Sequence, residues 1–578
     1  MVTRAVVAAC LVVGFGCRSK PSDPISRLTE EFVYTTLSFS PSSATSSGLH
    51  QYKGQNLDNL LDDLSPAGLD KQLHFYEDFQ NRLHQLQPDR LNPEDRADFT
   101  ILDDQCSLAL LDLKEIHSAL HSPTLYVETL GNALFSPFVL DYAPKPERIQ
   151  SIMARLQKVP LFLDQAATNL SSSPAIWTQV AGQENQGNMD LVDKTIRAEV
   201  PDNLHDAYAR AARPALDAMK KFQDYLQKNL SALGDYDWRL GQDRYTRKFR
   251  YQLETGVEAD TTLEHAEQEL AKVRARMFDL ALPLAANPHK ELSGEARTNA
   301  VIRDALDKIA SRHGTPQSYM EDARQDLAEA RAYVQQKHLV TLPADSNLQV
   351  IPTPAFMRGI YSVGGFNPAP PLEPKLGAFY WVTPIPADWP AERIDSKLRE
   401  YNFYKLKLLT IHEAMPGHYV QMQISNSVEP PPRRLLRSIY GNGPYIEGWA
   451  QYAEQMMLDS GFFQSPEMAL TFLKEDLRVI ANAILDVRLQ MLNMTDQEAL
   501  DLMENQTFQE KEEAVEKLQR AKLSSAQLPT YFAGWAGWLK AREDYQKAKG
   551  SAYNLTAFND SALHEGAVPL PALSRLLH

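Results

Sequence analysis

The stretch "TTLEHAEQELAKVRARMFDL" (residues 261–280) carries the pattern that decides the fold. Its apolar residues recur at alternating steps of three and four, at Leu263, Ala266, Leu270, Val273, Met277 and Leu280. That spacing places them on one face of an α-helix, and Thr261 with Glu264 matches a capping box at its start. Similar stripes occur over residues 146–170, 206–233, 295–337 and 465–492. The sequence therefore predicts a mainly helical protein in which these stripes form the core.

One segment departs from the helical pattern. Nine prolines lie between Pro352 and Pro390, a density that excludes a helix. The apolar runs "LVTLP", "LQVIPTP", "GIYSVGG" and "GAFYWVTP" predict one small sheet near residues 339–384. Two interpretations stand side by side: a buried sheet that fills a gap between helices, or an edge strand at 377–384 that pairs with an extended peptide. The second makes Gly377, Phe379 and Tyr380 candidate substrate contacts.

Length and charge limit the possible functions. The chain has 578 residues and a formal net charge of −15, so a role in binding nucleic acid is not expected. The densest basic stretch, "PPPRRLLR" (430–437), is too short to change that. We expect an N-terminal helical subdomain over 25–250 and a catalytic helical subdomain over 251–578.

The N-terminus has the features of an export signal. In "MVTRAVVAACLVVGFGC" (residues 1–17), Arg4 precedes an apolar run too short to span a bilayer. The run ends at Cys17 and resembles the lipobox of bacterial lipoproteins, in which the cysteine is lipidated. Residues 18–24 then form a tether. We expect an envelope lipoprotein anchored at Cys17 and facing the periplasm, with plain secretion as the alternative. A chain lipidated at Cys17 keeps only Cys106, which excludes a disulfide framework.

A candidate metal site lies in "LLTIHEAMPGHYVQ" (408–421). His412 and His418 are six residues apart, so a regular helix would point them about 120° from each other. Pro416 has no N–H and clashes within a helix, and Gly417 tolerates the turn that follows. If two residues are looped out, the spacing falls to four and the imidazoles converge. The alternative is a helix end with two incidental histidines.

A third ligand is required, since catalytic zinc keeps three protein ligands and one open position. "YIEGWAQYAEQM" (445–456) supplies acidic residues. On a helix its residues Glu447, Gln451 and Glu454 share one face, opposite an aromatic face. An isolated helix of this kind would be read as having a solvated acidic face. Beside the histidines it indicates a face that bears ligands.

These motifs resemble a known family. "HEAMPGHYVQ" followed by "EGWAQYAE" is similar to the signature of the bacterial family called domain of unknown function 885, often described as lipoproteins. "WRLGQDRY" (238–245), "GAFYWVTP" and "GAVPL" (566–570) extend the resemblance over most of residues 25–575. That family is in turn similar to the helical gluzincin zinc peptidases, such as thimet oligopeptidase, carboxypeptidase Taq and angiotensin-converting enzyme.

The resemblance implies a large helical metallopeptidase-like fold with a deep cleft. It implies one zinc ion held by His412, His418 and Glu447, with Glu413 as general base. Glu454 is then an outer partner or an alternative ligand.

Two further residues follow from the same resemblance. "PTYFAGWAGWLK" (529–540) is similar to the Tyr-x-x-Gly stretch of the peptidases, so Tyr531 is the candidate transition-state tyrosine. An aromatic packed in the core is the alternative for this residue. Arg478 is expected to contact substrate. The family's Asp-x-Gly-x-His cluster after this arginine is "DVRLQ" here, with Arg488 and Gln490 at the glycine and histidine positions, which puts activity in question.

Together the residues predict zinc-dependent hydrolysis of amides, with short peptides as the expected substrates. Two alternatives remain open: a zinc amidase acting on non-peptide amides, and a catalytically inactive binding lipoprotein.

Overall fold

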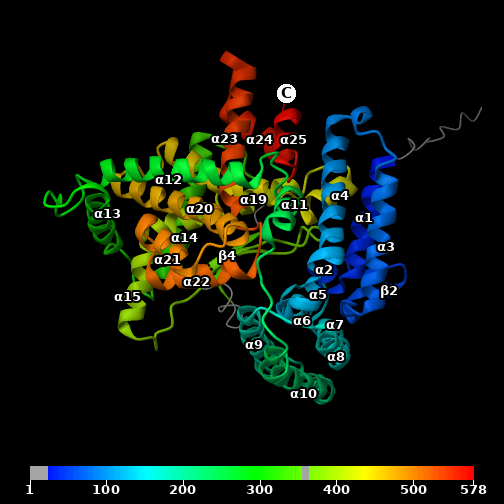
Figure 1. Ribbon diagram of the computed structural model, residues 1–578. Helices are drawn as coiled ribbons and strands as arrows, with labels where there is room; N and C mark the ends of the chain where they lie inside the picture. Colours follow the sequence, from blue (N-terminus) through cyan, green and yellow to red (C-terminus); the bar gives the residue numbers. More distant parts are fainter. Residues whose placement is uncertain (1–23, 345–346, 354–363, 578) are drawn as a thin grey trace, which may run out of the picture.

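The computed structural model describes residues 24–344, 347–353 and 364–577 and is mainly helical with a small sheet (Figure 1). This confirms the predicted fold class. The predicted signal segment, most of the tether, and Cys17 lie outside the described residues. Over the described ranges, no helix combines the length and apolar character that crossing a bilayer requires.

The first half of the chain forms eleven consecutive α-helices within the described residues. They are α1 (Pro24–Phe39), α2 (Pro41–Ser46), α3 (Pro66–Leu83), α4 (Pro93–Leu111), α5 (Ser118–His121), α6 (Pro123–Val139), α7 (Lys145–Leu156), α8 (Val159–Asn169), α9 (Ala175–Asp190), α10 (His205–Lys228) and α11 (Gly241–Leu253). A two-residue hairpin, β1 (Gln51–Tyr52) with β2 (Gln55–Asn56), follows α2. The predicted subdomain boundary at residue 250 falls within α11, and the two subdomains stay a prediction.

The second half builds the larger core around the candidate site. Its helices before the ligand motif are α12 (Ala259–Ala281), α13 (Gly294–Ala310), α14 (Tyr319–Lys337) and α15 (Ala391–Glu400). Those from the motif onward are α16 (Phe403–Glu413), α17 (His418–Ser425), α18 (Pro431–Ile439), α19 (Gly443–Asp459), α20 (Pro466–Met491), α21 (Asp496–Asp501), α22 (Lys511–Leu523), α23 (Pro529–Lys549), α24 (Leu555–His564) and α25 (Leu570–Leu576).

The stripe in α12 is buried as predicted, but its cap is not. Ala266, Leu270, Val273 and Met277 lie in the core. The helix begins at Ala259, with Glu258 in extended conformation as its N-cap and without a side-chain cap. Thr261 is therefore inside the first turn, and the predicted capping box is wrong. Buried Ala259 belongs to a second core cluster, so packing explains the earlier start.

The small sheet is mixed and has the strand order β3-β5-β4. β3 (Leu348–Pro352) runs parallel to β5 (Ala378–Val382), and β4 (Gly364–Asn367) runs antiparallel to it. "LVTLP" forms no strand, and part of "GIYSVGG" lies outside the described residues. β5 is the central strand, paired on both sides, so the prediction that residues 377–384 offer an open edge is wrong. The edge strand nearest the metal motif is β4.

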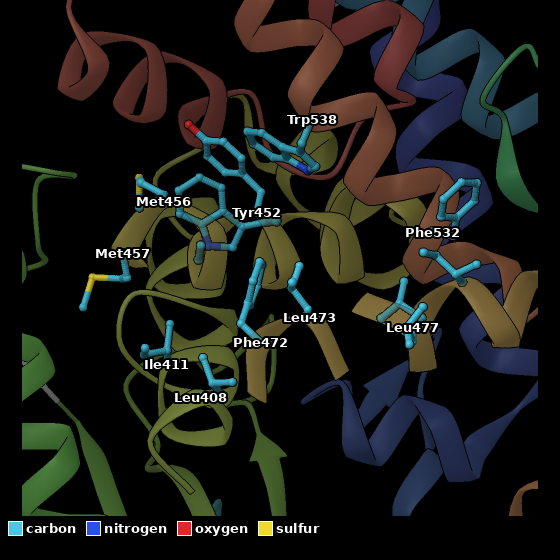
Figure 2. Close-up of a cluster of buried hydrophobic side chains, with 14 of the residues drawn as sticks. Leu408, Ile411, Tyr452, Met456, Met457, Phe472, Leu473, Leu477, Phe532 and Trp538 are labelled. Carbon is cyan, nitrogen blue, oxygen red and sulfur yellow. The ribbon is translucent and has the colours of Figure 1, made fainter. Parts of the chain in front are cut away.

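Figure 2 shows the core beneath the site, where α16, α19, α20 and α23 pack together. The buried side chains come from all four helices: Leu408, Ile411, Tyr452, Met456, Met457, Phe472, Leu473, Leu477, Phe532 and Trp538. These apolar faces fix how the opposite, polar faces of the helices are oriented. The cavity described below is lined mainly by polar residues of these helices, together with apolar ones such as Leu408.

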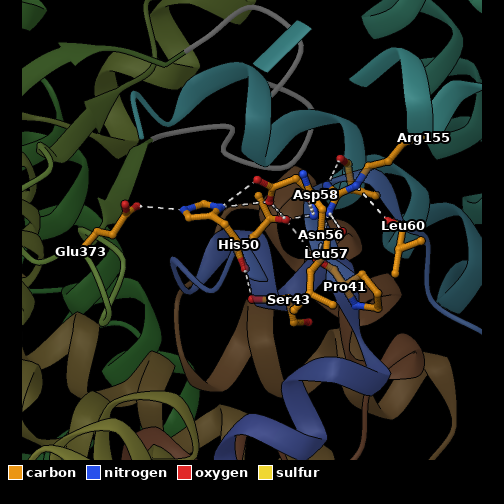
Figure 3. Close-up of polar contacts among 12 residues, drawn as sticks. Pro41, Ser43, His50, Asn56, Leu57, Asp58, Leu60, Arg155 and Glu373 are labelled. Carbon is orange, nitrogen blue, oxygen red and sulfur yellow. Dashed lines mark hydrogen bonds and ion pairs between the residues drawn. The ribbon is translucent and has the colours of Figure 1, made fainter. Parts of the chain in front are cut away.

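Buried polar contacts hold the N-terminal helices together and tie them to the later chain (Figure 3). The Arg155 guanidinium is fully buried and donates hydrogen bonds to the carbonyl oxygens of Leu60, Leu57 and Pro41. His50 lies between Asp58, 3.0 Å away, and Glu373, 3.3 Å away. His50 therefore links the start of the chain to the loop that precedes β5.

Candidate metal centre

The break between α16 and α17 has the geometry that the proline predicted. The Met415 N–H donates to the Thr410 carbonyl five residues back, and the Gly417 N–H donates to the Ile411 carbonyl six residues back. In a regular α-helix, each N–H donates to the carbonyl four residues back. The chain therefore loops out two residues around Pro416, which has no N–H to give.

The imidazoles of His412 and His418 converge across this break. Their ring centroids are 4.8 Å apart and the planes are nearly perpendicular, at 89°. From α19, Glu447 Oε2 lies 3.8 Å from His412 Nε2 and 3.5 Å from His418 Nε2. Ligand atoms of the three residues all lie within 4.8 Å of one another. The helix-end alternative does not account for this convergence with an acidic residue.

This donor set fits zinc. Two imidazole nitrogens and one carboxylate oxygen are ligands that zinc accepts in catalytic sites. Ligand atoms about 2.0–2.1 Å from a tetrahedral zinc ion are about 3.3 Å apart. The separations between Glu447 Oε2 and the two histidine nitrogens, 3.8 and 3.5 Å, are close to that value.

Glu454 lies on the far side of His412 from Glu447. Its Oε1 is 2.8 Å from His412 Nδ1, whereas Nε2 is the atom that faces Glu447. A carboxylate on the outer nitrogen fixes the tautomer and orientation of a metal-binding histidine. Of the two predicted roles, the geometry favours the outer partner over the alternative ligand. His418 Nδ1 is buried and has no hydrogen-bond partner among the residues that the structure describes.

The carboxylates around the histidines dominate the local electrostatics. Burial lowers the pKa of His412, but Glu447, Glu454 and Glu413 outweigh burial and raise that pKa to about 10. Burial raises the pKa of Glu447, yet the two histidines hold it well below its usual range. In the absence of a cation, the site therefore keeps a proton on His412 and a charge on Glu447.

Glu413 is held by the edge strand of the sheet. Its Oε2 accepts a hydrogen bond of 2.9 Å from the Phe366 N–H of β4. Phe366 is paired in register with Tyr380 of β5, and its N–H points away from that strand. β4 therefore orients the predicted general base and also lines the cavity.

Tyr531 lies at the same cavity. It is at the start of α23, which packs closely along α19. The charge of Glu447 and burial together raise the pKa of Tyr531 to about 12, with Arg520 acting in the opposite direction. The hydroxyl therefore stays protonated near neutral pH and can donate a hydrogen bond.

A cavity of about 720 Å³ connects these groups. His412, His418 and Glu447 line it, together with Glu413 and Tyr531. Arg478, the predicted substrate contact, also lines it, and its guanidinium contacts Glu513 at 2.9 Å and Glu475 at 3.6 Å.

One known protein family matches most of this chain. The family model described as "Bacterial protein of unknown function (DUF885)" matches residues 41–577. The chain belongs to the DUF885 family. No curated protein matches the chain. Similarity to the gluzincin peptidases stays a prediction.

Two solved structures are similar to this DUF885 chain. A "putative lipoprotein of unknown function" from Shewanella oneidensis is 28% identical, with a TM-score of 0.80, over 96% of this chain and all (100%) of its own. A "putative lipoprotein" from Colwellia psychrerythraea is 17% identical, with a TM-score of 0.76, over 96% of this chain and 98% of its own. The second likeness concerns the fold alone.

Three of the predicted substrate contacts lie elsewhere in the DUF885 fold. Gly377, Phe379 and Tyr380 are not among the described residues that line the cavity. Tyr380 is fully buried in the central strand, with its hydroxyl 3.2 Å from Thr410 Oγ1 of α16. Its role is to attach the sheet to the helix that carries His412.

The departure from the DUF885 pattern also falls outside the cavity lining. Arg488 pairs with Glu267 of α12 at 2.5 Å. Gln490 is buried, and its Oε1 accepts a 2.9 Å hydrogen bond from the Leu240 N–H. Both residues join α20 to neighbouring segments, so neither takes the place of a group at the metal site.

Sequence reasoning missed several residues of the site. Lys405, Lys517 and Arg520 line the cavity, as does Asn482. Lys517 and Arg520 lie on α22, and the many charged residues of its sequence indicate an ordinary solvent-exposed face. The i, i+3 spacing of the two cations was the only available signal, and it does not distinguish a cavity wall from a surface.

Proposed function

We propose that this protein is a zinc-dependent hydrolase, most specifically a metallopeptidase that cleaves short peptides. One observation carries the proposal: His412, His418 and Glu447 converge at a cavity that Glu413 and Tyr531 also line. Three ligands leave one zinc position open, which distinguishes a catalytic site from a closed structural one. The cavity volume of about 720 Å³ suits a ligand of a few residues.

Each residue takes a role from its position. A bound zinc ion would lower the pKa of water and polarise the scissile carbonyl. Glu413, oriented by the Phe366 N–H, takes the proton from water and passes it to the leaving amine. Tyr531 donates a hydrogen bond to the oxygen on which negative charge develops. Glu454 keeps His412 in the orientation that ligation needs.

The first experiment measures metal content and hydrolysis together. The purified protein should contain one zinc per chain and hydrolyse members of a panel of short peptides. Glu413→Gln should retain zinc and lose about 10²–10⁴-fold in kcat, because it removes the general base and no ligand. A parent protein that binds no zinc under any loading condition would contradict the proposal.

The same panel separates the alternatives. Hydrolysis of acyl-amino acids but of no peptide would identify an amidase. Stoichiometric zinc without any hydrolysis would favour a binding protein.

We further propose that the protein is a lipid-anchored envelope lipoprotein. The support is the lipobox-like sequence at Cys17 together with the description of the Shewanella protein as a lipoprotein. Cys17→Ser should move the protein from the membrane fraction to the soluble fraction, since stable anchoring requires more than one acyl chain. Unchanged fractionation of the variant would reject the anchor.

A further inference from the structure

The cavity wall carries a group of cationic side chains besides the metal ligands. Lys405 of α16, Arg478 of α20, and Lys517 and Arg520 of α22 all line it. The first two already have carboxylate partners. Lys405 Nζ contacts Glu475, and Arg478 contacts Glu513 and Glu475.

Lys517 has no such partner. Its side chain is only 7% exposed, yet no hydrogen bond or ion pair joins its amine to any residue in the described part of the chain. Burial, Arg478 and Arg520 together hold the pKa of Lys517 well below its usual value, with Glu513 acting weakly against them. Ionising a buried amine that has no hydrogen-bonded carboxylate is costly. Its position in the cavity wall suits an anion that arrives with a ligand.

Arg520 extends this feature toward the metal ligands. It lies one turn after Lys517 on α22, so both side chains share a face. Its hydrogen bond from Nη2 to Gln527 Oε1 is a long one, 3.4 Å. Arg520 also acts to lower the pKa of Tyr531, which the charge of Glu447 raises. Tyr531, Arg520, Lys517 and the three metal ligands all line the same cavity.

We propose that Lys517 and Arg520 form a subsite for a carboxylate of the substrate. The inference rests on the proposed hydrolase function and narrows its substrates to short peptides or acyl-amino acids with a free C-terminal carboxylate. The carboxylate binds to the amine and guanidinium while the amide bond beside it lies over the metal ligands. The nearby Glu475 and Glu513 disfavour a doubly charged phosphate and favour a single negative charge.

A binding experiment tests the subsite without catalysis. The probes are hippurate and hippuramide, which differ only in the carboxylate, and calorimetry uses metal-free protein so that no metal binds the probe. The parent should bind hippurate more tightly than hippuramide. Lys517→Met and Arg520→Gln should each lower the affinity for hippurate by about tenfold or more. Hippuramide binding should be unchanged by either variant.

Three variants complete the design. Lys511→Met, on the same helix but outside the cavity lining, is the matched control and should bind hippurate like the parent. Lys517→Arg keeps a cationic side chain and should retain most of the parent's affinity for hippurate. Lys517→Met should also melt higher than the parent when no ligand is present, because it replaces a buried amine that has no hydrogen-bond partner among the described residues with an apolar side chain of similar length. Equal binding of the two probes by the parent, or unchanged hippurate binding in Lys517→Met, would overturn the proposal.

Rates of peptide hydrolysis then test the proposed subsite separately from the proposed hydrolase function. The zinc-loaded parent should prefer a peptide with a free C-terminus over its amidated form, and Lys517→Met should abolish the preference mainly through KM. Hydrolysis of both forms at equal rates would overturn the subsite and leave the hydrolase standing. Selective hippurate binding without hydrolysis of any peptide would overturn the hydrolase and leave the subsite standing.

Discussion

Gly417 shows how closely one residue can control the metal centre. A Cβ built at this position would lie 1.8 Å from the His412 carbonyl oxygen and 2.4 Å from that of Ile411. Only glycine therefore allows the chain to pass so close to the end of α16. Trp449 Nε1 donates to the carbonyl oxygens of Pro416, at 2.9 Å, and Gly417, at 3.2 Å. The Gly417 carbonyl also accepts from the Gln421 N–H at the start of α17, so the indole chiefly satisfies the Pro416 carbonyl at the break.

Gly417→Ala should therefore displace His412 relative to His418. We expect a loss of about 1–3 kcal/mol in the free energy of unfolding, as in other overpacked sites, and at least about tenfold weaker zinc binding. Thermal melting and competition with a zinc chelator measure the two effects. Gly187→Ala is the matched control, since a Cβ there meets nothing within 4 Å and helix α9 should gain about 0.5–1 kcal/mol. Parent-like zinc affinity in Gly417→Ala would contradict this account of the break.

At the scale of elements, the crossing of α19 and α23 sets the distance between Glu447 and Tyr531. The two helices touch through glycines: a Cβ on Gly448 would lie 2.3 Å from the Gly534 carbonyl carbon. A Cβ on Gly534 would lie 2.1 Å from the Pro444 carbonyl oxygen. The obstacles are backbone atoms, which cannot move aside without moving a helix.

Gly534→Ala should push α23 away from α19. The expected cost is about 1–3 kcal/mol of stability, and hydrolysis should fall because Tyr531 moves away from the metal ligands. Zinc content should be nearly unchanged, since all three ligands lie outside α23. Circular dichroism, zinc analysis and kcat together test this. Full activity in Gly534→Ala would show that the helix spacing does not position Tyr531.

At the scale of the whole molecule, buried ion pairs join the N-terminal helices to the segment that follows the metal motif. Arg433 and Arg437 of α18 both reach Asp98 of α4, at 2.6 and 2.8 Å, and Arg433 also reaches Asp95 at 2.5 Å. Leu435 and Leu436 of α18 complete an apolar cluster with the first helices of the chain. Two arginines of the basic stretch "PPPRRLLR" thus form ion pairs within the fold.

Removing Asp98 should destabilise this junction strongly. Asp98→Ala leaves the buried guanidinium of Arg437 and the partly buried guanidinium of Arg433 with an incomplete set of partners, and breaking such a pair costs about 3–5 kcal/mol. Chemical denaturation measures the loss. The control is Asp89→Ala at an exposed position, where the change should stay within about 0.5 kcal/mol. Equal stability of the two variants would mean that the ion pairs do not hold the halves together.

Local patterns were sufficient to predict much of this molecule. Apolar stripes such as that of α12, the proline-rich strands, and the opening of the helix at Pro416 depend on neighbours within a few residues. Steric rules and periodicity act at that range, and the structure agrees with them. The acidic face of α19 was also predictable, because Glu447, Gln451 and Glu454 repeat at helical spacing.

Other features depend on residues far apart in the chain. The central place of β5, the attachment of Glu413 to Phe366, and the choice of Glu454 as outer partner follow from how the sheet and α19 pack against α16. Lys517 and Arg520 look like surface charges until α22 is seen to close the cavity. The burial of Lys517 without a hydrogen-bonded carboxylate arises from tertiary packing, because the same lysine on an exposed helix would lie in water.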